Sequence, residues 1–367
     1  MMTGKISKSA AVAALVVAMA APVGASSSAA PQSLEPVFSS SLAVNGATTT
    51  REGRLFVPVQ PSRSGAPQLM EIRDGKPVAY PDNRWNGWKP GMDGHDRFVG
   101  VNAIRVGPDG ALWVVDRGSP GVGKPPVPGG FKLVKIDLSR DRVERVYDLD
   151  SVSRPWSFID DVRFRGDHAY LTDAGAPGLI VLDVGTGKGR RVLEGHPSTV
   201  AQSPLKAEGK PLTTEKGDPV NIHADQLEVS PDGKWLYYQP CSGRLSRIET
   251  KHLDDPRLGD AELARHVERF ADTPSTGGTA IGKDGTIYLS DVDKKRILTI
   301  SPQGHVKTLF SDSRLIWVDA MWIDDKGDLL LPAAQLNRTP GLNGGKNTVQ
   351  QPITLYRYPI GQKGARG

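Results

Sequence analysis

Five of six regularly recurring positions in this chain carry a carboxylate or a carboxamide. The positions lie 57, 58, 65, 52 and 42 residues apart and are Asn45, Asn102, Asp160, Asp225, Gly277 and Asp319. If a fold brings them together, the three carboxylates repel one another unless some take up protons or a cation binds among them. Oxygen donors without a thiolate suit Ca²⁺ or Mg²⁺ better than copper or structural zinc, and an organic amine would meet the same field.

These side chains are the candidate ligand-binding residues, and the five recurring ones are also the tentative metal ligands. The ligand-binding candidates are Asn45, Asn102, Asp160, Asp161, Asp225 and Asp319. The alternative is structural, because an Asp or Asn that starts a strand often accepts hydrogen bonds from nearby backbone N–H groups. For Asp116, Asp173 and Asp291, which end the following strands at matching offsets, we favour that structural role.

A catalytic role, if there is one, would fall on Asp225 or on His223, which precedes it by two residues. Of the seven histidines, His223 is the best placed to act as a base. A structural or solvent-facing His223 is the alternative that we favour. The sequence contains no Gly-x-Ser-x-Gly, His-Glu-x-x-His or phosphate-binding motif, so serine hydrolases, zinc proteases and nucleotide-dependent enzymes have no support. Nothing indicates a flavin or a haem.

The elements that must position these residues form a repeat. Residues 223–249 begin with a polar residue, continue with alternating apolar positions and a Ser-Pro-Asp-Gly turn, and end in two further strands. Related turns, each followed by an apolar strand, have glycines at 53, 110, 166, 285 and 327. Six such meanders predict an all-β, six-bladed β-propeller, because radial repetition buries both faces of each small sheet. In that fold the recurring positions line the mouth of the axial channel.

Three long loops are expected on the face that carries the channel mouth. They span residues 119–130, 201–219 and 337–351. Long loops on a rigid scaffold often carry function, although tolerated insertions explain them equally well. Between two of the meanders, residues 260–270 have helical periodicity, and Asp260 is the expected N-cap of a short helix.

The N-terminus has the pattern of a secretory leader. Lys5 and Lys8 precede an apolar run that ends in small residues, which predicts a cleaved signal over 1–25, a disordered linker over 26–34 and one propeller domain over 35–367. Cleavage would remove two lysines and no acid, so the formal charge falls from +5 to +3. Without a basic cluster, nucleic-acid binding is not expected, and no membrane attachment is expected after cleavage. Cys241 is the single cysteine and is expected to be buried and inert.

The motifs together resemble the major royal jelly protein/yellow family. The resemblance spans roughly residues 85–358 and rests on LWVVDRG at 112–118, AYLTD and GLIVLD between 169 and 183, and LEVSPDGKWLYY at 227–238. It implies a secreted six-bladed propeller whose channel binds small ligands, biogenic amines among them. The family usually has Asp-Gly where this chain has Asp225-Gln226, which implies an altered pocket floor.

More distantly, the chain is similar to gluconolactonase-like propellers, which hold a divalent cation on the axis. That resemblance implies Asn45, Asp160 and Asp225 as acceptable ligands, but Gly277 stands where those enzymes have an aspartate. Asp319 is the candidate replacement. Three functions therefore stay open: a propeller that binds a cation or a small cationic ligand, a Ca²⁺-dependent or similar lactone hydrolase, and a protein- or glycan-binding module that uses the long-loop face.

Overall fold

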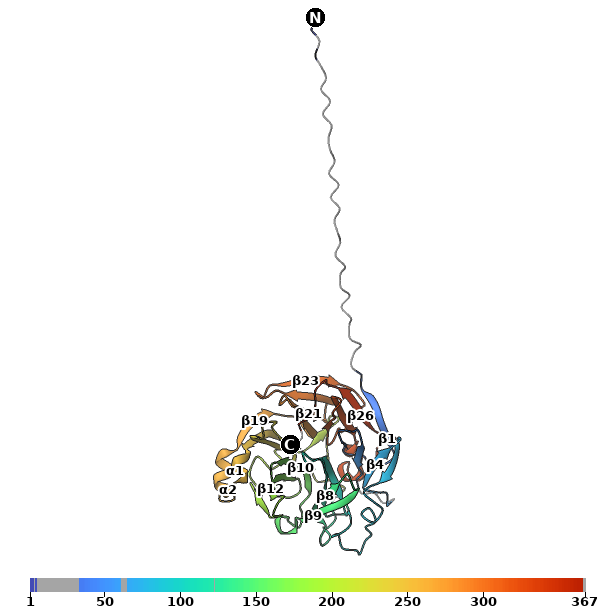
Figure 1. Cartoon of the computed structure of the whole chain (residues 1–367), viewed down its shortest axis with the longest axis vertical. Coiled ribbons are helices and arrows are strands. Elements are labelled where there is room, and N and C mark those ends of the chain that lie inside the picture. The colour runs from blue at the N-terminus through green and yellow to red at the C-terminus, as the bar shows by residue number, and fades with distance from the viewer. Residues whose placement is uncertain (3, 5–32, 61–64, 122, 366–367) are drawn as a thin grey trace. The chain divides into compact units, whose positions relative to one another are not determined.

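Six antiparallel sheets of four strands each surround a central axis and form a six-bladed β-propeller (Figure 1). This computed structural model describes residues 1, 2, 4, 33–60, 65–121 and 123–365. The leader predicted over 1–25 and most of the linker predicted over 26–34 lie outside the described residues. Leu34, at the end of that linker, is buried at 7% exposure.

Each of the first five blades is a meander in which successive strands pair, as the repeat predicts. The first blade consists of β2 (Thr48–Thr49), β3 (Leu55–Pro58), β4 (Leu69–Arg73) and β5 (Lys76–Ala79). The second consists of β6 (Val101–Val106), β7 (Leu112–Arg117), β8 (Phe131–Asp137) and β9 (Arg142–Asp148). The third consists of β10 (Ile159–Arg165), β11 (His168–Asp173), β12 (Gly178–Asp183) and β13 (Gly189–Val192). The fourth consists of β16 (Ala224–Val229), β17 (Trp235–Pro240), β18 (Arg244–Glu249) and β19 (Glu268–Asp272). The fifth consists of β20 (Thr276–Ile281), β21 (Ile287–Asp291), β22 (Arg296–Ile300) and β23 (Val306–Ser311).

The sixth blade closes the ring with strands from both ends of the domain. It contains β24 (Trp322–Ile323), β25 (Asp328–Ala333) and β26 (Ile353–Pro359), and its outer strand is β1 (Glu35–Ser40). Figure 1 shows the blue β1 beside the red β26, and the two strands pair antiparallel from Glu35–Arg357 to Ser40–Ile353. Because the first strand completes the last blade, the ring cannot open without breaking this ladder.

The core lies between neighbouring blades. One cluster joins Trp113 and Leu133 of the second blade to Val162 and Leu171 of the third, all of them at most 3% exposed. Similar clusters join the other blades, so both faces of each sheet are covered by apolar side chains. The scaffold around the channel is therefore packed on all sides.

The helix predicted over 260–270 is only partly present. The short helices are α1 (Thr250–Asp254) and α2 (Asp260–Leu263), with single 3-10 turns at Asp150–Val152, Ala264–His266, Leu336–Arg338 and Pro340–Leu342. Glu268–Asp272 is instead the strand β19, because pairing with β18 completes the fourth blade. Asp260 is not the N-cap either: Gly259 holds that position, and the Asp260 carboxylate accepts the Leu193 N–H at 2.8 Å. Within the described residues no helix is long and apolar enough to span a membrane.

A one-residue irregularity marks the start of every innermost strand. In blades two to five the register against the second strand shifts at the recurring position, which places bulges at Asn102, Asp160-Asp161, Asp225 and Gly277-Gly278. In blades one and six the isolated pairs Val44–Val59 and Val318–Ala333 are likewise out of step with the ladders that begin at Thr48 and Trp322. A bulge bends the strand and re-aims a side chain, so the repeat itself turns these residues toward the axis.

Candidate functional site: the acidic channel mouth

The amide side chains and one carboxylate form a chain of hydrogen bonds from blade to blade. Asn45 Nδ2 donates to the backbone carbonyl of Asn102 at 3.1 Å. Asn102 Nδ2 in turn donates to Asp160 at 2.6 Å (Oδ1) and 3.1 Å (backbone O). The structure therefore brings Asn45, Asn102 and Asp160 together, as the spacing predicts.

Arg117 supports this chain of hydrogen bonds from behind. It is 2% exposed and donates through Nη1 to Gln60 Oε1 at 2.9 Å and to Asn102 Oδ1 at 3.4 Å. Its guanidinium also stacks 4.5 Å from the ring centroid of Phe158. Burial lowers the pKa of Arg117 to about 10 against the attraction of Asp116 and Asp160. Sequence reasoning missed Arg117 and Gln60, because neither occupies a recurring position.

The Asp225 carboxylate is held by two neighbours from its own blade. Gln226 Nε2 donates to Oδ1 at 2.6 Å, and the Cys241 thiol donates to Oδ2 at 3.2 Å. The Asp225 backbone carbonyl accepts the Thr172 hydroxyl at 2.6 Å, which ties the fourth blade to the third. Cys241 is buried, as expected, and burial raises its pKa well above 9.0. Its contact with Asp225 has no signal in the sequence.

The three carboxylates of the mouth share an environment that opposes ionisation. Burial, followed by repulsion from Asp161, raises the pKa of Asp160 to about 7 despite the hydrogen bond from Asn102. Burial and the charges of Asp160 and Asp319 raise the pKa of Asp225 well above 3.8. Burial and the charges of Asp160 and Asp161 do the same for Asp319. Near neutral pH this group therefore retains protons, which a bound cation would displace.

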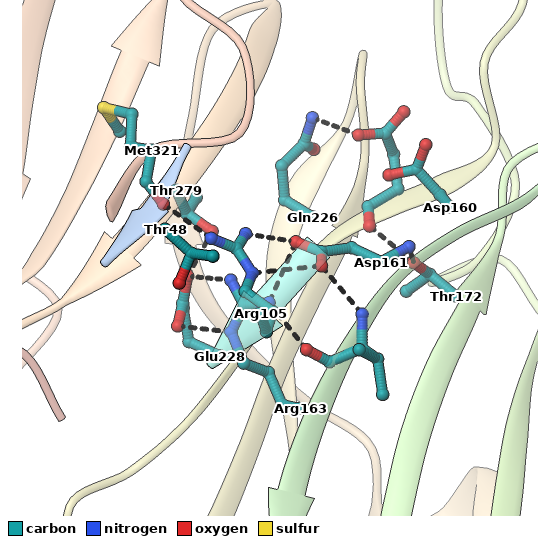
Figure 2. A network of polar contacts seen from close by, with 12 residues as sticks. Thr48, Arg105, Asp160, Asp161, Arg163, Thr172, Gln226, Glu228, Thr279 and Met321 are labelled. Atoms are coloured by element: carbon teal, nitrogen blue, oxygen red, sulfur yellow. Dashed lines mark hydrogen bonds and ion pairs between the residues drawn. The ribbon is translucent and has the colours of Figure 1, made fainter. Parts of the chain in front are cut away.

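Asp161 has a different environment from Asp160. Figure 2 shows its carboxylate between two guanidinium groups: it accepts from Arg105 Nε at 3.1 Å and from Arg163 Nη1 at 2.8 Å. These charges outweigh the effect of burial and lower the pKa of Asp161 to about 2. Both carboxylate oxygens are thus occupied by ion pairs, and Asp161 contributes to the floor of the mouth.

The same ion-pair network closes the channel below the mouth. Arg163 also binds Glu228 at 2.7 and 2.9 Å, and Glu228 accepts the Thr279 hydroxyl at 2.9 Å. A cavity of about 20 Å³, room for about one water, lies against Arg105, Arg163 and Glu228 beyond this network. The network therefore separates the acidic mouth from the opposite end of the axis.

The second-strand aspartates have the structural role that the sequence favours. Asp116 accepts the backbone N–H groups of Val99, Gly100 and Gly118 at 2.8 to 2.9 Å and pairs with Lys132 at 2.7 Å. Asp173 accepts N–H groups from residues 158, 175 and 176 and pairs with Arg191. Asp291 accepts the Lys294 N–H and pairs with Arg296. These carboxylates fasten the loops around the mouth.

His223 also has a structural environment. Its Nδ1 accepts the Ala201 N–H at 3.1 Å, which places the proton of the neutral ring on Nε2. Burial lowers its pKa, so the ring is neutral at pH 7. Nδ1 is therefore unavailable as a base.

The ring position of the fifth blade cannot accept a side chain. A Cβ on Gly277 would lie 2.4 Å from the Val318 carbonyl oxygen, and one on Gly278 would lie 2.3 Å from that of Asp319. Ser290 fastens this close approach: its hydroxyl donates to the Val318 carbonyl at 2.7 Å and accepts both glycine N–H groups. An aspartate at position 277 would require the sixth blade to move.

Two buried oxygens beside the carboxylates have no hydrogen-bond partner in the described part of the chain: Asn45 Oδ1 and Gln226 Oε1. Each residue is 3% exposed. A buried acceptor without a donor is costly, and such exceptions mark sites where a ligand or water supplies the donor. Asp160, Asp225 and Asp319 keep partial exposure, so the mouth is reached by solvent.

The donors match a hard cation in chemistry but not in arrangement. All of them are oxygens, as Ca²⁺ or Mg²⁺ requires. Among the described residues, however, no group of three or more His, Cys, Asp or Glu side chains is arranged to hold a metal ion. Asp160 and Asp225 already accept hydrogen bonds from Asn102 and Gln226, so a metal ion would have to displace these amides.

Two of the predicted long loops meet beside the mouth. Thr213 of 201–219 pairs with Asn343 of 337–351, and Glu208 binds Arg338 at 2.8 Å. The third loop, 119–130, instead contacts the connection between the first two blades, where Gly94 N donates to Pro128 O at 2.9 Å.

The fold and the site define a six-bladed propeller with an acidic channel mouth, and solved structures share the propeller fold. A gluconolactonase from Xanthomonas campestris matches at 12% identity, covers 89% of each chain and has a TM-score of 0.53. A calcium-binding regucalcin from Agrobacterium tumefaciens matches at 12% identity over 90% of this chain and 95% of its own, with a TM-score of 0.54. A luciferin-regenerating enzyme matches at 12% identity over 92% of this chain and 98% of its own, with a TM-score of 0.56.

The profile of the major royal jelly protein family matches residues 99–359, so this chain belongs to that family. This membership confirms the resemblance that the sequence motifs indicate. No curated protein sequence matches the chain. At 12% identity the solved structures establish the shared fold.

Proposed function

We propose that the channel mouth binds a small organic cation that carries N–H donors, such as a primary amine. The observation that carries the proposal is the combination of three carboxylates that resist ionisation with two buried acceptors that lack donors. An ammonium group supplies both missing components, a positive charge and several N–H donors.

The electrostatics predict how binding depends on pH. The free mouth keeps protons because its carboxylates are buried and repel one another, and a cation makes their ionised forms favourable again. Binding should therefore release protons near pH 7, where Asp160 titrates. The affinity for an amine should rise with pH through this range while the amine itself stays charged.

A metal-dependent lactone hydrolase is the second candidate, and the gluconolactonase and calcium-binding regucalcin among the structural matches favour it. The close approach at Gly277 and the amides that already occupy Asp160 and Asp225 oppose it. The residues present therefore do not form a gluconolactonase-type metal site with an aspartate in the fifth blade. The predicted leader over 1–25 would place either activity outside the cytoplasm.

A thermal-shift series tests the proposal. Protein dialysed against EDTA is melted with millimolar primary amines, quaternary ammonium salts, Ca²⁺ or Mg²⁺, because a ligand that binds the folded state raises the melting temperature by mass action. Primary amines should raise it for the native protein and not for Asp225→Asn. A shift with Ca²⁺ alone, together with divalent-dependent lactone hydrolysis, would instead establish the enzyme. No shift with any cation would leave the long-loop face as the functional surface.

A further inference from the structure

The long loop between the third and fourth blades carries a small hairpin whose tip has an unusual residue. The strands β14 (Lys206–Ala207) and β15 (Lys210–Pro211) are joined by Glu208 and Gly209, with φ values of 51° and 78°. Two positive φ values define a turn that favours Asn, Asp or Gly at both positions. A glutamate at the first position is strained, so its side chain should have a compensating role.

The Glu208 side chain bonds to three neighbours outside the hairpin. Its carboxylate accepts from Arg338 Nε at 2.9 Å and Nη2 at 2.8 Å, and from Asn337 Nδ2 at 2.9 Å. Lys295 Nζ lies 3.3 Å away. Two parallel bonds to one guanidinium are the strong and directional form of an ion pair. The fifth blade and the 337–351 loop thus hold the hairpin tip.

The underside of this loop is apolar and covers the wall of the acidic mouth. Leu205, Ala207, Leu212 and Val220 are at most 5% exposed and share a cluster with residues of three blades. The blade residues are Cys241, Val292, Trp317 and Ala334. Cys241 is the residue whose thiol donates to Asp225, and Trp317 lies two residues before Asp319.

We propose that residues 201–220 form a gate beside the channel mouth, over Cys241, and that Glu208 is its latch. The gate would open by release of the Glu208–Arg338 pair, followed by loss of the bond from Gly209 N to Asp293 Oδ1 (2.7 Å) and of the Thr213–Asn343 pairing. The apolar underside would then withdraw while the six blades stay folded. Other contacts fasten the two ends of the segment: Ala201 N donates to His223 Nδ1 at 3.1 Å, and Cys241 N donates to the carbonyl of Ile222, just past the segment, at 3.2 Å. This inference rests on the proposed function of the mouth, because an open gate would widen the ligand's access to Asp225.

Cys241 reports opening without any ligand, because it is the single cysteine in the sequence and is 1% exposed beneath the gate. The experiment measures the rate at which methyl methanethiosulfonate modifies Cys241 in the native protein, in Glu208→Asn and in the control Glu215→Asn. Glu215 is exposed on the same loop, and no side-chain bond from it exists within the described residues. Arg338→Gln removes the latch from the other side.

If Glu208 is the latch, Cys241 should be modified about tenfold faster in Glu208→Asn and in Arg338→Gln, and at the native rate in the control. A tenfold change in rate corresponds to about 1.4 kcal/mol, which is typical of a charge-assisted hydrogen bond. If Glu208 served only the turn, Asn would suit the backbone better and modification would be slower or unchanged. That result would overturn the gate.

A second arm adds a primary amine. If the amine slows modification in all variants but Glu208→Asn reacts at the native rate, the site stands and the gate fails. If Glu208→Asn reacts faster but no amine protects the thiol, the gate stands and the proposed ligand is wrong.

Discussion

Replacing Asp160 with asparagine should stabilise the protein at alkaline pH. The new carboxamide would keep an oxygen that accepts from Asn102, as Asp160 Oδ1 does at 2.6 Å, and would resemble the protonated acid at every pH. In the native protein, the pKa of Asp160 is raised from 3.8 to about 7. The folded state therefore holds a proton that the unfolded chain has lost between these values. The stabilising contribution of the protonated acid is complete below about pH 4 and is lost as the pH rises through about 7.

The magnitude follows from these pKa values. The interval between 3.8 and about 7 corresponds to an upper limit of about 4 kcal/mol in the free energy of unfolding. Solvent reaches the mouth, and the variant gives up the attraction between Asp160 and Arg117. We therefore expect a gain of about 1–3 kcal/mol at pH 8.5 and about a third of that gain at pH 5, or roughly 1–4 °C in Tm at the higher pH.

The assay is thermal and urea unfolding at pH 5, 7 and 8.5 on protein dialysed against EDTA. Asp161→Asn is the matched control, because its carboxylate is paired with Arg105 and Arg163 and its pKa is lowered to about 2. Breaking these buried pairs should cost about 3–5 kcal/mol at all three pH values. Stability curves of Asp160→Asn and the native protein that run parallel between pH 5 and 8.5 would refute the assignment of a raised pKa to Asp160.

Two further substitutions test the scaffold around the mouth. Gly277→Ala places a Cβ 2.4 Å from the Val318 carbonyl and should cost about 2–3 kcal/mol in urea unfolding, whereas Gly341→Ala, which meets no atom within 4 Å, should cost much less. Equal losses for the two glycines would contradict the close approach. Asp116→Asn leaves Lys132 buried without its ion pair and should lower the free energy of unfolding by about 3–5 kcal/mol in the same assay. A loss below about 1 kcal/mol would show that the loops do not depend on this carboxylate.

The sequence predicts the six meanders and the positions that line the mouth because both depend on a local pattern that repeats. It does not reveal that Glu35–Ser40 closes the ring, since this strand pairs with Ile353–Arg357 at the far end of the chain. The misassigned helix has the same origin: residues 260–270 have helical periodicity, but Glu268–Asp272 pairs with the open edge of β18 as a strand.

The chemistry of the mouth depends on contacts that the repeat does not contain. Asp160 and Asp161 are adjacent and identical in type, yet one faces the mouth and the other pairs with two arginines. The bulge at this point separates their directions, and the sequence alone carries no sign of it. From the sequence, Gly277 is interpreted as a position where a metal-binding aspartate is missing. The structure shows instead a position that has no room for any side chain.

Calorimetric titration of a primary amine into the native protein and into Asp225→Asn tests the central claim most directly. The titrations are run at pH 7 in two buffers with different protonation enthalpies, so that proton release is measured together with affinity. We predict saturable binding of one amine per chain with release of protons, and a loss of affinity of at least tenfold in the folded variant. Binding of equal strength in both proteins, or no binding to either, would contradict the assignment of the acidic mouth as a cation site.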